Sequence, residues 1–230
     1  MYMKGRDKRG ISNHVEMILA SVLFITFFFF VMMFLQPYKT DSLTVSVIDG
    51  VYYVLEDFVK IDVREIFLTV NESFGECFSI PIELNGVVNG IVRDIYGNLI
   101  NSSLDGFTID IDAGAGAYYL LFSDKFNNSG FDSDCSILDH ENYDIGGSYD
   151  MKVLYFPLLE NLKDDYDNNY NDLRERLGIP NKFDFAITSD IIEMSRNIPE
   201  DVNVIAKSYV ENVMYKDGSV KNEVFIIRIW

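Results

Sequence analysis

The sequence predicts an α+β protein, in which a long N-terminal transmembrane helix precedes a β-rich globular head with one further helix. Two observations lead to this fold class. Residues 17–35 form an apolar run without charge, proline or glycine. After residue 60, short apolar or alternating runs recur between turn residues such as Asn85-Gly86 and Asn89-Gly90, which is typical of strands.

The apolar run is long enough to cross a membrane as a helix. At ~1.5 Å of rise per residue, residues 17–35 span roughly 28 Å, close to the ~30 Å hydrocarbon core of a bilayer. The residues that follow, Gln36-Pro37-Tyr38-Lys39, are not a small-residue cleavage site of the secretory type. We therefore expect the helix to stay part of the chain and to anchor the protein in membrane lipid.

Charge is distributed unevenly between the two sides of this run. The first ten residues carry Lys4, Arg6, Lys8 and Arg9 against Asp7, a net +3, whereas the whole chain carries −17 and the remainder therefore −20. A basic flank predicts a cytoplasmic N-terminus and an extracellular C-terminal domain, in a single-pass protein of the cell membrane. The acidity argues against nucleic acid as a partner, because phosphates would repel it.

The residues before the run carry a more specific pattern, Lys8-Arg9-Gly10-Ile11-Ser12-Asn13-His14-Val15-Glu16. This pattern resembles the class III signal peptide of type IV pilin-like proteins, especially archaeal ones. The resemblance implies that a prepilin-type peptidase cuts between Gly10 and Ile11. It further implies that Ser12 and Glu16 belong to a polar stretch and that the apolar helix assembles with other pilin-like subunits.

Glu16 departs from the bacterial form of the pattern. There the acidic residue lies five places after the cut, whereas Glu16 lies six places after Gly10. The resemblance implies that this carboxylate pairs with the amino end of a neighbouring subunit, because a carboxylate in an apolar bundle is costly unless it is paired. The alternative is that Glu16 lies at the edge of the apolar run, where headgroups and water solvate it.

The chain divides into four expected segments. Residues 1–10 form a basic leader, 11–36 the transmembrane or stem helix, 37–60 a continuation of that helix, and 61–230 the extracellular β-rich head. Pro37 ends or kinks the helix. The continuation rests on a helical stripe of apolar residues, Leu43, Val47, Val51, Leu55 and Phe58.

The head is expected to contain seven strands, one helix and a final hairpin. The helix lies within Leu158–Leu177 and ends at Gly178-Ile179-Pro180. The hairpin joins Val202–Tyr215 to Val220–Trp230 across an Asp-Gly turn. The seven strand-like runs are Glu65–Val70, Phe78–Leu84, Val87–Ile95, Phe107–Ile111, Tyr118–Phe122, Met151–Phe156 and Phe183–Thr188.

Two kinds of covalent modification are open to an exported head. Cys77 and Cys135 are the only two cysteines, and they either form a disulfide or stay as buried thiols. Three Asn-x-Ser sequons, at Asn71, Asn101 and Asn127, permit glycosylation without showing it.

The sequence offers no convincing set of catalytic or metal-binding residues, and we expect no cofactor. His140 is the one histidine beyond the anchor, and with Cys135 and Asp139 it makes a weak metal site. A second weak candidate resembles the first half of an EF-hand loop, but Tyr170 and Arg176 occupy its glycine and glutamate positions. A solvated acidic face is the preferred interpretation of both acidic clusters, Asp132, Asp134, Asp139, Glu141 and Asp144, and Asp164, Asp165, Asp167, Asn169 and Asp172.

These observations favour a structural protein rather than an enzyme. The expected function is a membrane-anchored extracellular subunit resembling type IV pilins or pseudopilins, in a surface filament, adhesion or secretion assembly. The alternative is a single-pass surface receptor or ligand-binding module that is not processed. A membrane-tethered hydrolase ranks last, because the residues for it are missing.

Overall fold

The computed structural model describes the chain apart from residues 1–8, 36–37, 73–74, 83, 85–88 and 128–134. It consists of an N-terminal apolar helix followed by a large β-rich region with a few helices, in agreement with the α+β class. The chain forms two compact units, Met1–Val47 and Ile48–Trp230, and the second is called the head below. The helix α1 spans Arg9–Leu35 and α2 spans Tyr38–Val59.

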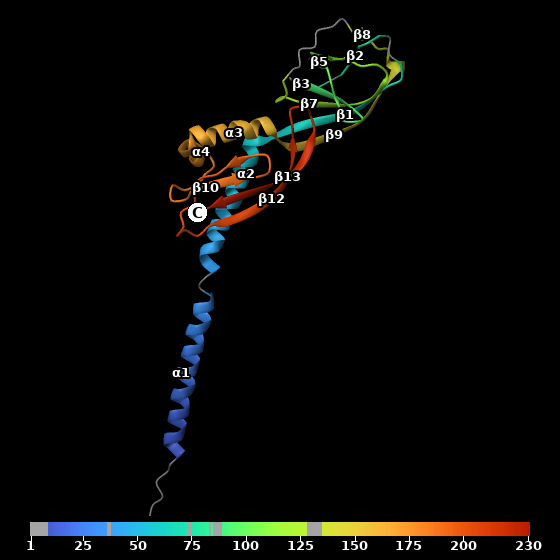
Figure 1. Cartoon of the computed structure of the whole chain (residues 1–230). Coiled ribbons are helices and arrows are strands. Elements are labelled where there is room, and N and C mark those ends of the chain that lie inside the picture. Colours follow the sequence, from blue (N-terminus) through green and yellow to red (C-terminus); the bar gives the residue numbers. More distant parts are fainter. Residues whose placement is uncertain (1–8, 36–37, 73–74, 83, 85–88, 128–134) are drawn as a thin grey trace, which may run out of the picture. The chain divides into compact units, whose positions relative to one another are not determined.

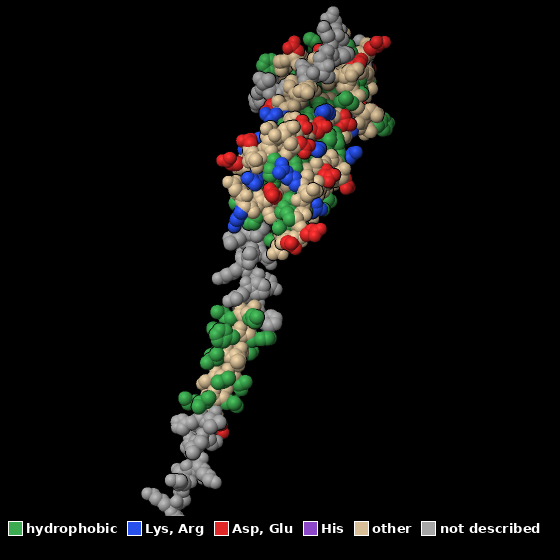
Figure 2. Space-filling model, turned by 60° about the vertical axis from the view of Figure 1, so that its left-hand side comes forward, with side chains coloured by type: hydrophobic (Ala, Val, Ile, Leu, Met, Phe, Trp, Pro, Cys, Tyr) green, Lys and Arg blue, Asp and Glu red, His purple; other side chains and the backbone are tan. Residues whose placement is uncertain are grey.

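The segment Glu16–Met33 of α1 is predominantly apolar. It has a mean hydropathy of 2.3 and buries none of its length, and among the described residues α1 is the one helix long and apolar enough to cross a membrane. Figure 2 shows hydrophobic side chains along the whole visible part of this segment. A helix of this kind is compatible with a single-pass membrane anchor or a signal anchor. Pro37, the expected helix breaker, lies outside the described residues.

The helix α2 is amphipathic, and its last three turns belong to the head. Ile48, Val51, Leu55 and Val59 are buried at helical spacing. The expected stripe included Val51 and Leu55, which are buried, and also Phe58, which is only half-buried, because Val59 takes the buried position at this end of the helix. Since these apolar residues pack into the head, the chain from Ile48 onward folds as one unit with it.

The head is built on a nine-stranded sheet in the order β11-β10-β13-β12-β9-β1-β7-β3-β4. Neighbouring strands are antiparallel, apart from β9 and β12, which are parallel. The strands are β1 (Lys60–Val70), β3 (Asn89–Asp94), β4 (Leu99–Ile100), β7 (Gly116–Ser123), β9 (Tyr143–Tyr155), β10 (Phe185–Thr188), β11 (Glu193–Met194), β12 (Ile205–Met214) and β13 (Val220–Ile229).

A second, four-stranded sheet has the order β5-β6-β2-β8. Its strands are β2 (Phe78–Pro81), β5 (Ser102–Asp105), β6 (Thr108–Ile111) and β8 (Ser136–Ile137). Each of the seven expected runs contains a strand, and the expected hairpin is present as β12 and β13. The two-residue strands β4, β8 and β11, the strand β5 and the 3-10 turn His140–Asn142 were not expected, because segments this short show no periodicity. The first half of β9 was also missed, because Gly146-Gly147 interrupts its alternation.

The second sheet packs on β1, β7 and β3, and together these elements form what we call the sandwich half of the head. Ile66, Leu68 and Val70 alternate along β1 toward the second sheet. Figure 1 shows this half at the end of the sheet opposite the helices. Its core also contains Phe78, Ile80, Ile82, Val92, Ile109, Ile111, Tyr118, Leu120, Phe122, Leu138 and Tyr143.

The other half of the sheet, with β10 to β13, is covered by α2, α3 (Phe156–Asn168) and α4 (Tyr170–Arg176), and we call it the helical half. Sequence predicted one helix between Leu158 and Leu177, and this was wrong. Asn169 has a non-helical backbone (φ −133°, ψ 38°) and divides the segment into two helices. Asparagine favours such breaks, because its side chain competes for backbone hydrogen bonds.

The end of α4 agrees with the expectation. Gly178 has φ +70°, its N–H donates to Glu175 O at 2.9 Å, and the N–H of Ile179 donates to Arg174 O at 3.0 Å. This pair of bonds is a Schellman motif, in which glycine takes the left-handed conformation at low cost. The chain can then turn back into β10, where the hydroxyl of Tyr166 donates to Phe185 O at 2.8 Å.

Candidate functional site

The residues of the expected processing and assembly site lie in α1. Gly10 and Ile11 are in its first turn, and their side chains lie outside the described residues. Glu16 is exposed and begins the segment that could cross a membrane. The structure therefore places the carboxylate at the N-terminal edge of the apolar surface, a position compatible with both interpretations of Glu16.

A polar network fastens α2 to β12, and we call it the stem seat. The Tyr52 and Tyr209 rings stack with centroids 3.7 Å apart and planes 5° from parallel. The hydroxyl of Tyr209 donates to Asp49 at 2.7 Å, and the ammonium of Lys60 lies 3.1 Å from Glu211. The seat consists of Asp49, Tyr52, Glu56, Lys60, Lys207, Tyr209 and Glu211, which are further joined by the pairs Tyr52–Glu211, Lys60–Glu56 and Lys207–Asp49.

The charges of the stem seat stabilise one another. Burial raises the pKa of the Glu56 carboxyl, but hydrogen bonds from Lys60 and Tyr52 outweigh burial and leave it below its usual value. Burial lowers the pKa of Lys60, and its bonds to Glu56 and Glu211 outweigh that effect and raise it. Burial and the bond to Glu211 raise the pKa of Tyr52. The seat therefore holds Glu56 and Lys60 in their charged forms. This suits a structural attachment and does not suit a site for proton transfer.

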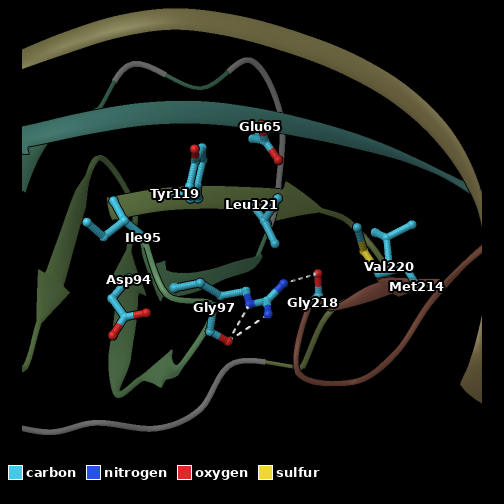
Figure 3. Close-up of a pocket in the computed structure, with 10 residues that line it drawn as sticks. Glu65, Asp94, Ile95, Gly97, Tyr119, Leu121, Met214, Gly218 and Val220 are labelled. Atoms are coloured by element: carbon cyan, nitrogen blue, oxygen red, sulfur yellow. Dashed lines mark hydrogen bonds between the residues drawn. The ribbon is translucent and has the colours of Figure 1, made fainter. Parts of the chain in front are cut away.

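A hollow of about 360 Å³ lies where the β12–β13 turn folds over β3 and β7 (Figure 3). The guanidinium of Arg93 bridges it, donating to Gly97 O at 2.6 and 3.1 Å and to Gly218 O at 3.0 Å. Asp94 accepts hydrogen bonds from the N–H groups of Tyr96 and Asn98. Because these polar groups close two turns, we interpret the hollow as a structural latch between the β12–β13 turn and strands β3 and β7.

A larger hollow, of about 1040 Å³, opens beside the sandwich core. Most of its lining is apolar and comes from both sheets, including Ile66, Ile82 and the 71% exposed Phe107. At its edge, His140 Nδ1 and the Tyr143 hydroxyl form a hydrogen bond of 2.8 Å. An apolar hollow with a few polar groups at the rim is the usual form of a small-ligand site.

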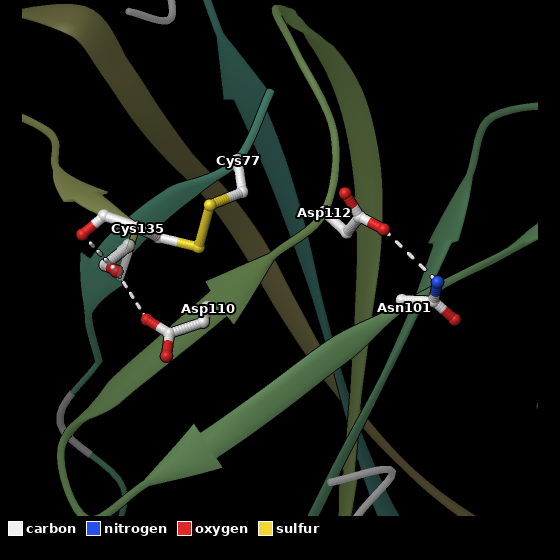
Figure 4. Close-up of a disulfide and its surroundings, with 6 residues drawn as sticks. Cys77, Asn101, Asp110, Asp112 and Cys135 are labelled. Carbon is white, nitrogen blue, oxygen red and sulfur yellow. Dashed lines mark hydrogen bonds between the residues drawn. A yellow bond between two sulfur atoms is a disulfide. The ribbon is translucent and has the colours of Figure 1, made fainter. Parts of the chain in front are cut away.

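Cys77 and Cys135 form a disulfide at the second sheet, with Cα atoms 5.3 Å apart (Figure 4). Of the two possibilities left open by sequence, the structure has the bridge. It ties the start of β2 to β8, 58 residues later. Beside it, Ser79 donates a hydrogen bond to Asp110. The bridge is therefore part of the sandwich framework.

The three sequon asparagines are all exposed on the head. Asn71 directly follows β1, and Asn127 lies four residues after β7. Asn101 lies between β4 and β5, where its amide donates to Asp112 at 3.2 Å (Figure 4). The rest of the Asn127 sequon lies outside the described residues.

Within its described part, the fold does not bring the weak metal candidates together. Among the described residues, no group of three or more His, Cys, Asp or Glu side chains could hold a metal ion. Asp132 and Asp134 of the first acidic cluster lie outside these residues. In the second, Asp165 pairs with Arg176 at 2.8 Å and Asp167 with Lys163 at 3.0 Å.

Sequence reasoning missed the stem seat and the Arg93 latch. A partial indication of the seat was present, since Glu56 and Lys60 are spaced i and i+4 at the end of a helix. Nothing local in the sequence shows that Arg93 meets a turn 125 residues later. Comparison of the chain with protein-family models, with curated proteins and with solved structures finds no match.

Proposed function

We propose that the protein is a membrane-anchored surface subunit resembling type IV pilins, with α1 as its anchor and assembly helix. One observation carries the proposal: the segment Glu16–Met33 of α1 is apolar and unburied, and its first residue, Glu16, lies six places after the Lys8-Arg9-Gly10 end of the leader. An exposed apolar helix with one carboxylate at its edge suits either lipid or a bundle of like helices, in which a neighbour's amino group pairs the charge.

The head supports assembly through the helix rather than through strand addition. The edge strands of the nine-stranded sheet, β4 and β11, have two residues each. Short edges give an incoming strand few free backbone groups to pair with. The stem seat meanwhile fixes α2 to β12, so a helix bundle would carry the heads with it.

Processing of the leader is the direct test. The full chain is expressed with and without a prepilin-type peptidase, and the N-terminal residue of the membrane-bound product is read by mass spectrometry. The expected product begins at Ile11 only when the peptidase is present. Gly10→Val should block the cut, and Gly5→Val, a matched change within the leader, should not. An intact Met1 under all conditions contradicts the proposal.

The role of Glu16 is tested by co-assembly. Tagged and untagged copies are expressed together, and the untagged copy that co-purifies in mild detergent is measured. Glu16→Gln should reduce the amount of co-purified untagged copy at least fivefold if the carboxylate pairs with a neighbour's amino end. Ser21→Ala is the control, because the Ser21 hydroxyl donates within its own helix, to Met17 O at 2.9 Å.

A second function, a surface receptor whose anchor is never processed, is favoured by the 1040 Å³ hollow. A ligand there would contact Ile66, Phe107 and Tyr143. Phe107→Ser removes an exposed apolar side chain and should abolish uptake of a fluorescent apolar probe such as an anilinonaphthalene sulfonate. Retained Met1 together with Phe107-dependent probe binding would favour the receptor over the pilin-like subunit.

A further inference from the structure

We propose that two heads pack face to face through the outward surface of the β12–β13 hairpin. This outer strip is formed by alternate residues of the two strands, which the hairpin register places on one face. It consists of Ala206, Ser208, Val210, Asn212, Asn222, Val224, Ile226 and Arg228, and it ends before the next pair on that face, Met214 and Val220, where Met214 is buried. The inference does not depend on leader processing or on a filament.

The strand β12 departs at three positions from the usual pattern for a sheet with one covered face. Such strands normally point apolar residues at the covering layer and polar residues at water. In β12 the charged Lys207 and Glu211 point at α2, within the stem seat. Val210 points the other way and is 68% exposed. A one-residue register shift would place Val210 inside, so the actual register leaves this apolar side chain exposed to solvent.

The outer strip is apolar at its centre. Val210 lies directly opposite Val224, which is 50% exposed, and Ile226 next to them is half-buried. Contiguous exposed apolar residues on a sheet face mark an interaction surface more often than scattered ones do. Within the described residues, the elements that cover the helical half pack on the opposite face, where Phe225 and Ile227 are buried.

Charge argues that the occupant is a second copy of the chain. Each chain carries −17 overall, so two copies repel wherever acidic surfaces meet. The outer strip contains no acidic residue, and Arg228 is its one charge. Contact between the strips of two copies therefore buries no strip carboxylate, and the nearest acidic residue in register on this face, Glu193, lies two strands away from Ile226.

The strip is also self-complementary. Arg228 lies at one end, and Asn212 and Asn222, a directly opposed pair, lie at the other, with Val210 and Val224 between them. A two-fold axis between the Ser208–Ile226 pair and the Val210–Val224 pair brings each Arg228 to the asparagines of the second copy, whose amide oxygens accept hydrogen bonds. The same axis keeps the two guanidinium groups apart and packs Val210 and Val224 of each copy on Ser208 and Ile226 of the other, as an isologous interface requires.

Cysteine crosslinking tests this arrangement. The two native cysteines are joined in the disulfide, so a cysteine introduced by Val210→Cys is the sole free thiol in the chain. The full chain in detergent micelles is oxidised under mild conditions, and covalent dimer is measured on a non-reducing gel. Tyr96→Cys is the matched control, because Tyr96 is 84% exposed on the sandwich half.

The expected result is at least tenfold faster dimer formation by Val210→Cys than by Tyr96→Cys. Association through α1 alone raises the local concentration of both variants equally, so equal rates overturn the proposal. Failure of leader processing would leave this comparison unaffected, which keeps the two proposals separable.

A charge placed on the strip gives an independent measurement. Val210→Glu should weaken head dimerisation at least tenfold, measured by sedimentation of the full chain in density-matched detergent. Val210 is exposed, so the fold should persist, and fluorescence of Trp230, the chain's single tryptophan, checks this. Tyr96→Glu is the control, and an equal effect of both variants would contradict the proposal.

Discussion

The two halves of the nine-stranded sheet use the same face in different ways. In the sandwich half that face is apolar, with Leu68 and Leu120 fully buried against the second sheet. In the helical half it combines the apolar Phe225 and Ile227 of β13 with the charged Lys207 and Glu211 of β12. The sandwich half is thus held by burial and a disulfide, and the helical half by burial and a polar seat.

This difference teaches how a helix is placed on a sheet. Apolar contacts are non-directional, so Val51 and Leu55 alone would allow α2 to slide along the strands. The Tyr52 stack and the ion pairs of Lys60 restrict it to one register. Variants that affect one half and not the other therefore test whether apolar burial supplies the stability and the polar contacts supply the register.

The largest expected difference follows removal of the disulfide. The double substitution Cys77→Ser and Cys135→Ser removes a bridge between residues 58 positions apart. A native bridge of this kind contributes about 2–4 kcal/mol to the free energy of unfolding. Hydrogen exchange should accelerate in β2 and β6 and much less in β10 and β13, because local opening follows the lost constraint. The Trp230 fluorescence transition, which reports the helical half, serves as the internal control. Equal acceleration in both halves would show that they unfold as one unit.

The next effect concerns the turn that joins the two halves. Gly218 has φ +76°, and a Cβ there would lie 2.6 Å from Leu121 Cδ1 and 3.3 Å from Ile91 Cγ2. Gly218→Ala should cost about 1–2 kcal/mol for the left-handed backbone and a further ~1–3 kcal/mol for overpacking. Denaturant unfolding measures both contributions together.

Gly178→Ala separates these two contributions. Gly178 has φ +70°, but a Cβ there meets nothing within 4 Å, so this variant carries the backbone cost alone. The difference between the two alanine variants is the packing contribution of the latch between the β12–β13 turn and β3 and β7. Equal losses would mean that the turn is free to lift away from Leu121 and Arg93.

Much of this fold could be predicted from sequence, and the exceptions have physical reasons. The apolar run, the alternating strands and the Asp217-Gly218 hairpin are local patterns, and the structure contains all three. The second sheet could not be assigned, because pairing of two-residue strands such as β8 depends on partners far along the chain. The α3–α4 break at Asn169 was missed because apolar spacing continues across it.

The candidate sites divide in the same manner. Gly10 and Glu16 are read from a contiguous motif, whereas the two cysteines left the disulfide open until the structure showed it. The outer strip on β12 required the structure. Its alternation is visible in sequence, but only the contact of Lys207 with Asp49 shows which face is covered. Direction relative to the core is a tertiary property.

The smallest expected effect is the pH dependence of the stem seat. Because the pKa of Glu56 is below its usual value of about 4.5 in the folded state, its ion pair stabilises the head above that pH. The contribution is lost as the pH falls through the folded-state pKa, since the carboxyl is then protonated in both states. Glu56→Gln should therefore lower stability at pH 7 by less than about 1 kcal/mol, because the pair is partly solvated.

The same comparison has an internal check. Thermal unfolding of the wild type and of Glu56→Gln between pH 7 and pH 3 should show that the greater stability of the wild type disappears below pH ~4.5. Asp57→Asn removes an exposed carboxylate one residue away on α2 and should leave that advantage in place. If wild type and Glu56→Gln instead kept a constant difference down to pH 3, the ion pair with Lys60 would not be the source of the stabilisation. The position of α2 would then rest on the Tyr52–Tyr209 stack.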